Sequence, residues 1–309
     1  MGKCVCLQGF SKIELKIQSC TIMSFSNKIV TYLFLIALVV MSLPLHAREK
    51  RALVIGLGKQ EDKNWAKING DKDIFLVRKM LSDAGFGEVH TLVNENATKA
   101  NIVGAFNTII DRSGAGDVVY IHFSGHGQQM TDFDHDEDDD WDECWIPYDA
   151  YLKCCERDDG SRHLTDDEIN AMLYRLKAKV GSKGKILVVV DACHSGDSSR
   201  GDKETYRGTR DVFHAEKTAY DGTETSSPEN WIIVSACRDY QRNAELKTDE
   251  GQYGKLTYAL YTLLRQKHGV TNYQLYKELC RFFDKNRGAL QQTPVMKGLI
   301  THFNITDIL

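Results

Sequence analysis

The sequence predicts an α/β domain in which a mostly parallel sheet carries helices on both faces. Short apolar runs alternate along the chain with longer segments whose apolar residues recur at helical spacing. This alternation is typical of βαβ units, in which each helix crosses over one face of the sheet. The chain has no internal repeat, only 4 prolines and no convincing linker, so we expect one domain.

The first part of this domain supplies three strands and two helices. The strands are expected at 52–56, 89–93 and 117–123, and the helices at 71–84 and 98–110. Gly85 and Gly87 end the first helix, and Thr98 or Asn96 caps the second. The third strand runs directly into Ser124-Gly-His-Gly127.

The second part continues the alternation after a helix over 164–176, which Thr165 and Glu168 open in a capping-box pattern. Strands are expected at 185–190 and 231–235, and helices at 256–265 and 272–285. The first of these strands runs into Asp191-Ala-Cys-His-Ser-Gly196. Residues 197–230 are rich in Gly, Ser, Thr and charge, and we expect a mobile loop there.

Residues 1–47 are interpreted as an N-terminal extension and signal peptide, leaving 48–309 as the folded domain. Lys28 precedes an uncharged run over 29–43, and Ala47 is a small residue at a plausible cleavage point. The run is shorter than the roughly 20 apolar residues of a membrane span. We therefore expect a secreted or periplasmic protein with no stable membrane span after signal removal. An uncleaved anchor is the alternative, and Met23 is an alternative start.

Charge and cysteine content exclude several classes of protein. The net charge is −4, without the basic excess of a general nucleic-acid binder. Six cysteines follow the expected signal, none in a C-x-x-C pair, so a zinc ribbon is not indicated. The sequence leaves their disulfide state open. A dinucleotide site at Gly56-Leu-Gly58 is not favoured either, because the third glycine of that motif is missing.

Two residues with catalytic chemistry stand at the ends of predicted strands. His126 lies between two glycines, and Cys193 follows another strand closely. The carboxyl ends of parallel strands meet at one edge of a sheet, so the two side chains can share a cleft. A thiolate attacks a carbonyl well only when a nearby base handles its proton and hydrogen-bond donors stabilise the oxyanion. The pair therefore indicates nucleophilic catalysis, although either residue alone is more often structural.

Five short motifs, in order, resemble those of metacaspases and their bacterial caspase-like relatives, cysteine proteases of clan CD. They are Phe-Ser-Gly-His-Gly (123–127), Trp-Ile-Pro-Tyr-Asp (145–149), Leu-Thr-Asp-Asp-Glu-Ile (164–169), Asp-Ala-Cys-His-Ser-Gly (191–196) and Ser-Ala-Cys-Arg-Asp (235–239). The resemblance implies a caspase-like three-layer sandwich and a cysteine endopeptidase. It also implies that His126 is the general base and Cys193 the nucleophile, with the amides of Gly127 and Cys193 as the oxyanion hole. No third triad member is apparent, which fits a dyad that needs no cofactor for its chemistry.

Specificity is expected to come from an acidic pocket. Asp191 lies two residues before the nucleophile, so its carboxylate should face the same pocket and pair with Arg or Lys. The resemblance adds Asp73 as a second pocket acid and Ser124 as a pocket-lining hydroxyl. We therefore expect protein or peptide substrates cut after basic residues. The alternative for Asp73 is a charge that stabilises a helix N-terminus.

An acidic stretch raises the question of calcium. Nine of the twelve residues from Asp132 to Glu143 are Asp or Glu, but residue 137 is Glu where an EF-hand loop needs Gly. The resemblance implies a calcium site that matches Asp142, Asp166 and Asp167, with calcium as an activator. Asp197 and Asp202 are candidates for a further ligand. The alternative is a solvated acidic loop beside a helix-capping aspartate.

The loop over 197–230 contains several basic residues next to the expected active site, namely Arg200, Lys203, Arg207, Arg210 and Lys217. A protease that cuts after such residues is expected to nick itself there, as a zymogen does. The resemblance favours a monomer. Two alternatives stay open: a catalytically silent calcium-binding module on the same fold, and a protease of the clostripain or gingipain type.

Overall fold

The computed structural model describes Tyr32 and residues 48–132, 140–193, 204–215, 231–266, 268–298 and 303–309. The chain divides into two units, Met1–Ala47 and Arg48–Leu309, and the fold described below is that of the second unit. The expected signal peptide lies outside the described residues apart from Tyr32. Within the described part of the chain, none of the helices has the length and apolar character needed to cross a membrane.

A six-stranded sheet with the order β11-β8-β7-β3-β1-β2 forms the centre of the domain. Its strands are β1 (Lys50–Gly56), β2 (Glu88–Val93), β3 (Val118–Ser124), β7 (Lys185–Asp191), β8 (Ile232–Ser235) and β11 (Val295–Lys297). Neighbouring strands pair in parallel, except for the antiparallel edge strand β11. All seven residues of β3 are buried, as expected of a central strand that is covered on both faces.

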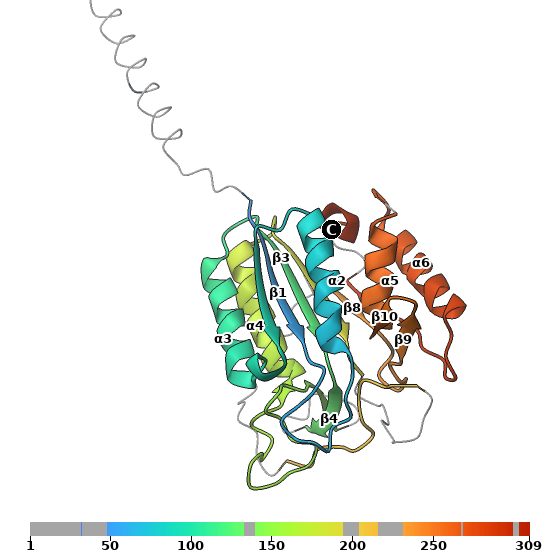
Figure 1. The fold of residues 1–309 in the computed structure, drawn as a ribbon. Helices are drawn as coiled ribbons and strands as arrows, with labels where there is room; N and C mark the ends of the chain where they lie inside the picture. Colours follow the sequence, from blue (N-terminus) through green and yellow to red (C-terminus); the bar gives the residue numbers. More distant parts are fainter. Residues whose placement is uncertain are drawn as a thin grey trace, which may run out of the picture. The chain divides into compact units, whose positions relative to one another are not determined.

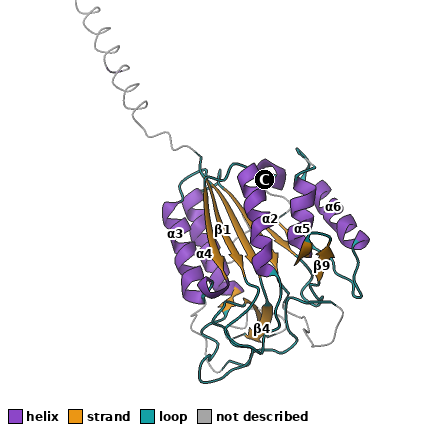
Figure 2. Cartoon of the chain, viewed as in Figure 1, coloured by secondary structure: helices purple, strands orange, loops and turns teal. Residues whose placement is uncertain are grey.

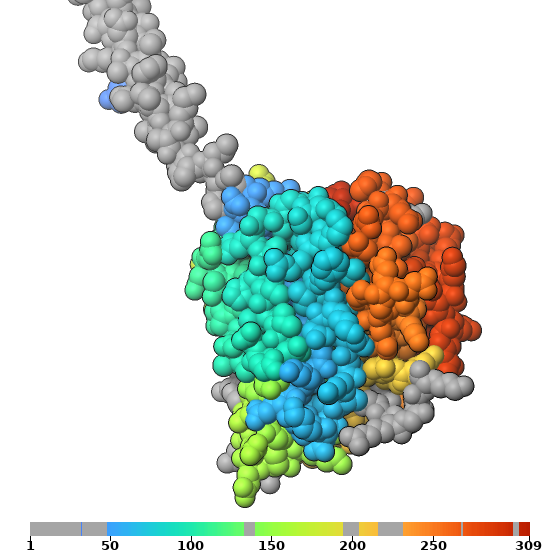
Figure 3. All heavy atoms as spheres, in the orientation of Figure 1, coloured from blue at the N-terminus to red at the C-terminus, as the bar shows by residue number. Residues whose placement is uncertain are grey.

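Helices cover both faces of this sheet (Figure 1). They are α2 (Gly70–Asp83), α5 (Lys255–Leu264) and α6 (Asn272–Lys285) on one face, and α3 (Lys99–Arg112) and α4 (Asp166–Val180) on the other. Successive residues of β1 alternate between the two cores: Ala52 packs with the first group and Leu53 with the second. In the space-filling view, α2 and α3 (cyan to teal) and α5 and α6 (orange to red) form the visible side of the domain (Figure 3). The three-layer α/β architecture predicted from the sequence is confirmed.

Two small sheets were not predicted from the sequence. One consists of β4 (Gly127–Thr131), β5 (Trp141–Trp145) and β6 (Leu164–Thr165), and the other of β9 (Glu245–Thr248) and β10 (Gly251–Gly254). Figure 2 shows β4 beyond the arrowheads of the central strands, at the edge where their carboxyl ends meet. Two short 3₁₀ helices, Asn94–Asn96 and Ile305–Asp307, complete the described elements. The small sheets therefore build walls around the edge at which the sequence places its catalytic motifs.

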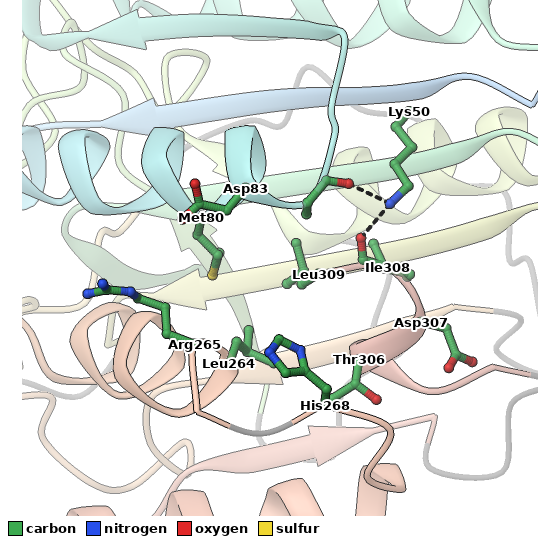
Figure 4. A pocket seen from close by; sticks show the side chains of 11 residues that line it. Lys50, Met80, Asp83, Leu264, Arg265, His268, Thr306, Asp307, Ile308 and Leu309 are labelled. Atoms are coloured by element: carbon green, nitrogen blue, oxygen red, sulfur yellow. Dashed lines mark hydrogen bonds between the residues drawn. The ribbon is translucent and has the colours of Figure 1, made fainter.

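A cavity of about 420 Å³ lies at the opposite end of the sheet (Figure 4). Lys50 begins β1 and donates through Nζ to the carbonyl oxygens of Ala84, at 2.7 Å, and Ile308, at 2.9 Å. Burial, followed by the charge of Arg48, lowers the pKa of Lys50. These contacts connect the C-terminal residues to the start of β1, at the end of the sheet opposite the catalytic motifs.

The N-terminal cap of α6 gives a direct test of helix stability. Thr271 accepts a hydrogen bond from the Gln274 amide, and its own amide donates to the Gln274 side chain at 2.9 Å. We expect Thr271→Ala to lower the free energy of unfolding by about 1 kcal/mol in urea denaturation. Thr108→Ala is the matched control, because the exposed Thr108 hydroxyl donates within α3 to the Gly104 carbonyl and caps no helix end. An equal loss in both variants would contradict the capping role.

Candidate active site

The two catalytic motifs extend from the ends of neighbouring parallel strands. The last residues of β3 and β7, Ser124 and Asp191, are partners in register, and the two strands pair over their full seven residues. His126 and Cys193 each follow two residues beyond this last pair. Paired strands lie about 4.8 Å apart, and the Gly125 amide bonds to the Asp191 carbonyl at 3.4 Å. The structure thus brings both motifs to the same edge of the sheet.

His126 is completely buried and is held by the backbone of a preceding loop. Its Nε2 lies 2.8 Å from the carbonyl oxygen of Ala66, and the Trp65 ring packs against the imidazole at 4.9 Å between centroids. A carbonyl only accepts hydrogen bonds, so Nε2 carries the proton. The other ring nitrogen, Nδ1, has no hydrogen-bond partner among the described residues. This nitrogen is therefore available to accept a proton.

Burial, with a smaller contribution from the nearby Arg207 charge, lowers the pKa of His126 to about 4. The imidazole is neutral at pH 7, as a general base must be before it takes a proton. The Ala66 carbonyl orients the ring in place of a carboxylate side chain. Sequence reasoning could not find this support, because any residue type at position 66 presents the same backbone oxygen.

Cys193 is buried where β7 meets two other segments of the chain. Its thiol donates to the carbonyl of Gln241 at 2.8 Å, and its amide donates to the carbonyl of Arg207 at 2.8 Å. A side-chain hydrogen bond with Cys193, followed by burial, raises the pKa of the Cys237 thiol. Cys237 belongs to the Ser-Ala-Cys-Arg-Asp motif, so the fold places two of the five sequence motifs side by side.

A pocket of three carboxylates lies next to Cys193 and encloses the guanidinium of Arg207. We call Asp73, Asp191 and Glu245 the carboxylate pocket; all three are buried, as is Arg207. Nη1 of Arg207 donates to Asp73 at 2.8 Å and lies 3.6 Å from the Asp191 carboxylate. Nε and Nη2 donate to Glu245 at 3.1 and 3.0 Å. The guanidinium also donates to the Ser124 hydroxyl at 2.5 Å.

Further hydrogen bonds hold the two aspartates in place. The Gly254 amide donates to Asp73 at 2.9 Å, while Asp191 accepts from the Asn243 side chain and the Thr257 amide, each at 2.8 Å. Burial raises the pKa of Asp73, against the opposing charge of Arg207. Burial also acts to raise the pKa of Asp191, but Arg207 and these hydrogen bonds lower it overall. The pocket is therefore built to hold one cation.

The structure brings together all three residues that the sequence assigned to the specificity pocket: Asp73, Ser124 and Asp191. Asp73 lies in the first turn of α2, so the alternative role at a helix N-terminus coexists with its contact to Arg207. Sequence reasoning missed Glu245, which begins β9 and also accepts from the Asn69 amide at 2.6 Å. No recognisable motif surrounds this glutamate, and the antiparallel β9–β10 hairpin that carries it was not predicted.

The segment expected to be a mobile loop differs from that expectation in its middle part. Residues 204–215, here called the cleft segment, include four consecutive buried residues, 206–209. Tyr206 pairs with Ala244 on one side, while Gly208 pairs with Gly127 and Phe213 with Met130 on the other. These residues are therefore held by backbone pairing on both sides and are not exposed to solvent. Residues 194–203 and 216–230 of the expected loop lie outside the described residues.

The three aspartates assigned to calcium lie on adjoining elements. Asp142 is in β5 and Asp166 and Asp167 begin α4, while Cys144 of β5 pairs with Thr165 just before that helix. Carboxylate oxygens suit Ca²⁺ chemically. However, the described residues contain no group of three or more His, Cys, Asp or Glu side chains arranged to hold a metal ion. Residues 133–139 of the acidic stretch, and the candidates Asp197 and Asp202, lie outside the described residues.

Comparisons with known proteins agree with this fold. The caspase-domain family profile matches residues 49–303. The chain is 30% identical over 269 residues to metacaspase-2 of Arabidopsis thaliana, covering 79% of this chain and 60% of the relative. It is 29% identical over 222 residues to metacaspase-1 of Coccidioides immitis, covering 59% of this chain and 46% of the relative. The matched region thus spans about half the length of these relatives.

Solved structures share the fold. A crystal structure of a Geobacter sulfurreducens protein superposes with a TM-score of 0.58 at 24% identity, covering 80% of this chain and 92% of that one. Caspase-1 from Spodoptera frugiperda superposes with a TM-score of 0.55 at 13% identity, covering 82% and 88%. The profile match over residues 49–303 shows that the chain belongs to the caspase-domain family of cysteine peptidases. Within it the chain is metacaspase-like, as its sequence motifs predicted.

The size of Gly254 provides a test of the pocket. A Cβ at this position would lie 2.1 Å from the Asp191 carboxylate and 2.6 Å from Nη1 of Arg207. We expect Gly254→Ala, in a Cys193→Ala background, to lower the free energy of unfolding by about 1–3 kcal/mol through overpacking. Gly104→Ala on the surface of α3 is the control, because a Cβ there meets no atom within 4 Å. A silent Gly254→Ala would show that the pocket is not closely packed.

Buried His122 is expected to contribute to the acid dependence of stability. Burial lowers the pKa of His122 to about 4, well below the ordinary value of 6.5. The unfolded chain then binds more protons than the folded one between these values, so stability falls as the pH drops from 6.5 to 4. We expect His122→Gln to reduce that slope by up to about 1.4 kcal/mol per pH unit, measured by urea unfolding. His90→Gln, at an exposed position, is the matched control, and a larger loss of slope there than at His122 would be inconsistent with a buried neutral His122.

Proposed function

We propose that this protein is a cysteine endopeptidase that hydrolyses peptide bonds after Arg or Lys, with Cys193 as nucleophile and His126 as general base. The observation that carries the proposal is the position of Arg207. Its side chain fills the carboxylate pocket while its carbonyl oxygen accepts the Cys193 amide at 2.8 Å. The side chain of a basic residue and its own carbonyl group thus occupy one cleft together.

The chemistry follows from these positions. His126 Nδ1 takes the proton of the Cys193 thiol, and the thiolate attacks the carbonyl carbon of the basic residue. The Cys193 amide, together with the amide of Gly127, stabilises the negative charge on the carbonyl oxygen. The imidazolium then protonates the leaving amine, and water hydrolyses the resulting thioester. The Ala66 carbonyl keeps Nε2 protonated, so Nδ1 is the nitrogen that accepts and returns the proton.

The preference for a basic residue rests on charge and geometry. Asp73 and Glu245 bind opposite sides of the Arg207 guanidinium, and Asp191 adds a third negative charge. The Arg fork satisfies these acceptors with several donors, whereas a Lys ammonium would satisfy them as a point charge. An acidic side chain would meet like charges in a buried site and be rejected.

Several properties of the whole protein belong to the same proposal. We propose that the enzyme is exported by its N-terminal signal, acts on protein or peptide substrates as a monomer, and processes itself within 197–230. Calcium bound near Asp142, Asp166 and Asp167 would act as an activator, and no step above passes through it. The chemistry itself needs only the thiol, the imidazole and water.

The nucleophile and base are tested with fluorogenic peptides that end in Arg, Lys or Asp before the reporter, with and without calcium. We expect turnover of the Arg and Lys peptides, and a loss of at least about 10³-fold in kcat/KM for Cys193→Ala and His126→Ala. Cys155→Ala is a matched control, because that cysteine is exposed. Faster turnover of the Asp peptide would contradict the pocket assignment. No turnover of any peptide would favour a catalytically silent module.

The pocket acid is tested separately. We expect Asp73→Asn to lower kcat/KM for the Arg peptide by about 10- to 100-fold, because a charge-assisted hydrogen bond contributes about 1.5–3 kcal/mol. Asp111→Asn, at an exposed position at the end of α3, should leave kcat/KM unchanged. If both variants retain full activity on Arg, another group must determine specificity.

A further inference from the structure

The cleft segment binds as an extended peptide at the active site of its own chain. On one side, the Arg207 amide donates to the Asn243 carbonyl, and the Glu245 amide donates to the Thr205 carbonyl, each at 2.9 Å. Tyr206, between these two residues, forms an antiparallel bridge with Ala244. This is the pattern by which a peptide adds a strand to an exposed edge. The residues before Arg207 therefore lie in a defined register.

The pairing changes partner directly after Arg207. Gly208 pairs with Gly127, and farther along the Phe213 amide donates to the Gln129 carbonyl at 2.8 Å. The Arg207–Gly208 bond consequently lies where the segment passes from the β9 side of the cleft to β4. Cys193 and the Gly127 backbone flank this point.

Close packing at Gly208 fixes the bond against the nucleophile residue. A Cβ at Gly208 would lie 2.0 Å from the Cys193 carbonyl oxygen and 3.3 Å from the Cys193 Cβ. Only glycine fits here without a shift of backbone. The next basic residue in the segment, Arg210, is exposed and lies outside the carboxylate pocket. The Arg207–Gly208 bond therefore lies against the backbone and Cβ of Cys193.

We propose that the Arg207–Gly208 bond is the chain's own cleavage site, cut within the same molecule, and that Arg207 blocks the carboxylate pocket until this bond is cut. The proposal rests on the proposed function. Cys193 Sγ bonds to the Arg207 carbonyl carbon, and the Gly208 amine leaves with the proton carried by His126. One water molecule then hydrolyses the thioester, releasing an Arg207 carboxylate and the free thiol. Departure of the new end at Arg207 opens the pocket to other substrates.

The site is identified by mass spectrometry and N-terminal sequencing of purified full-length variants. We expect wild type to give a new N-terminus at Gly208, and Cys193→Ala to stay intact. Arg207→Gln should remain uncut at this bond, whereas Arg207→Lys should still be cut, because it keeps a cation in the pocket. Arg207→Lys also keeps the test decisive if Arg207→Gln fails to fold. Arg210→Gln is the matched control and should be cut like wild type.

Cleavage within one molecule is tested by mixing. Active wild type is added to full-length Cys193→Ala, whose cleft segment is buried in its own cleft. We expect less than about one-tenth of this chain to be cut at Arg207 during a time in which a free synthetic peptide of sequence 203–212 is fully cut between Arg and Gly. Rapid cutting of the intact Cys193→Ala chain at this bond would overturn the claim of self-cleavage within one molecule.

The outcomes separate this proposal from the proposed function. Turnover of Arg and Lys peptides by an enzyme that is nicked only at another residue, or that remains one chain, overturns the Arg207 site and leaves the function intact. Failure to cut any peptide together with no self-cleavage overturns both. A lag in peptide turnover that ends as the Gly208 terminus appears supports the blocking role, whereas full turnover before the terminus appears overturns it.

Discussion

The parallel pairing of β3 with β7 is the constraint on which the site depends. The last residue pair of these strands, Ser124 and Asp191, fixes the position at which the two following segments leave the sheet. A shift of one residue would reverse the face of every side chain on one strand and move Asp191 out of the carboxylate pocket. The apolar residues of β3 and β7 contribute to both cores, so burial on both faces resists such a shift. The energetics of the sheet thus determine the geometry of the cleft.

The carboxylate pocket concentrates charge in a place where charge is costly. Three carboxylates and one guanidinium are withdrawn from water, and their mutual attraction offsets a large desolvation penalty only while all partners are present. Arg207 shows this balance: burial acts to lower its pKa, but Asp73, Asp191 and Glu245 raise it overall. Under the proposed function, the three carboxylates repel one another when no cation is bound, and this repulsion favours the binding of a basic side chain. The same charges can therefore serve stability in the intact chain and recognition in the open cleft.

Much of the fold and part of the site could be predicted from the sequence. Apolar runs and helical periodicity predicted five of the six central strands and the five helices, because these elements bury continuous faces, whereas the short edge strand β11 was not predicted. Because His126 and Cys193 each follow a predicted strand, the sequence also predicted that the two motifs lie at the same edge of the sheet. The small sheets escaped prediction because they depend on pairing between distant segments, as Glu245 and the cleft segment illustrate. Arg207 was recognised only as one of several basic residues in a polar stretch, since nothing local distinguishes it from Arg210.

The carbonyl of Ala66 has a consequence for how this active site tolerates change. A carboxylate that orients a histidine is lost by a single substitution, but a main-chain oxygen survives every replacement of its own side chain. Systematic replacement of side chains would therefore leave this partner of the imidazole invisible. Only a change in the path of the loop, such as an insertion or deletion between Gly58 and Asn69, would remove it. The side chain at position 66 can therefore change while the length of the loop stays under constraint.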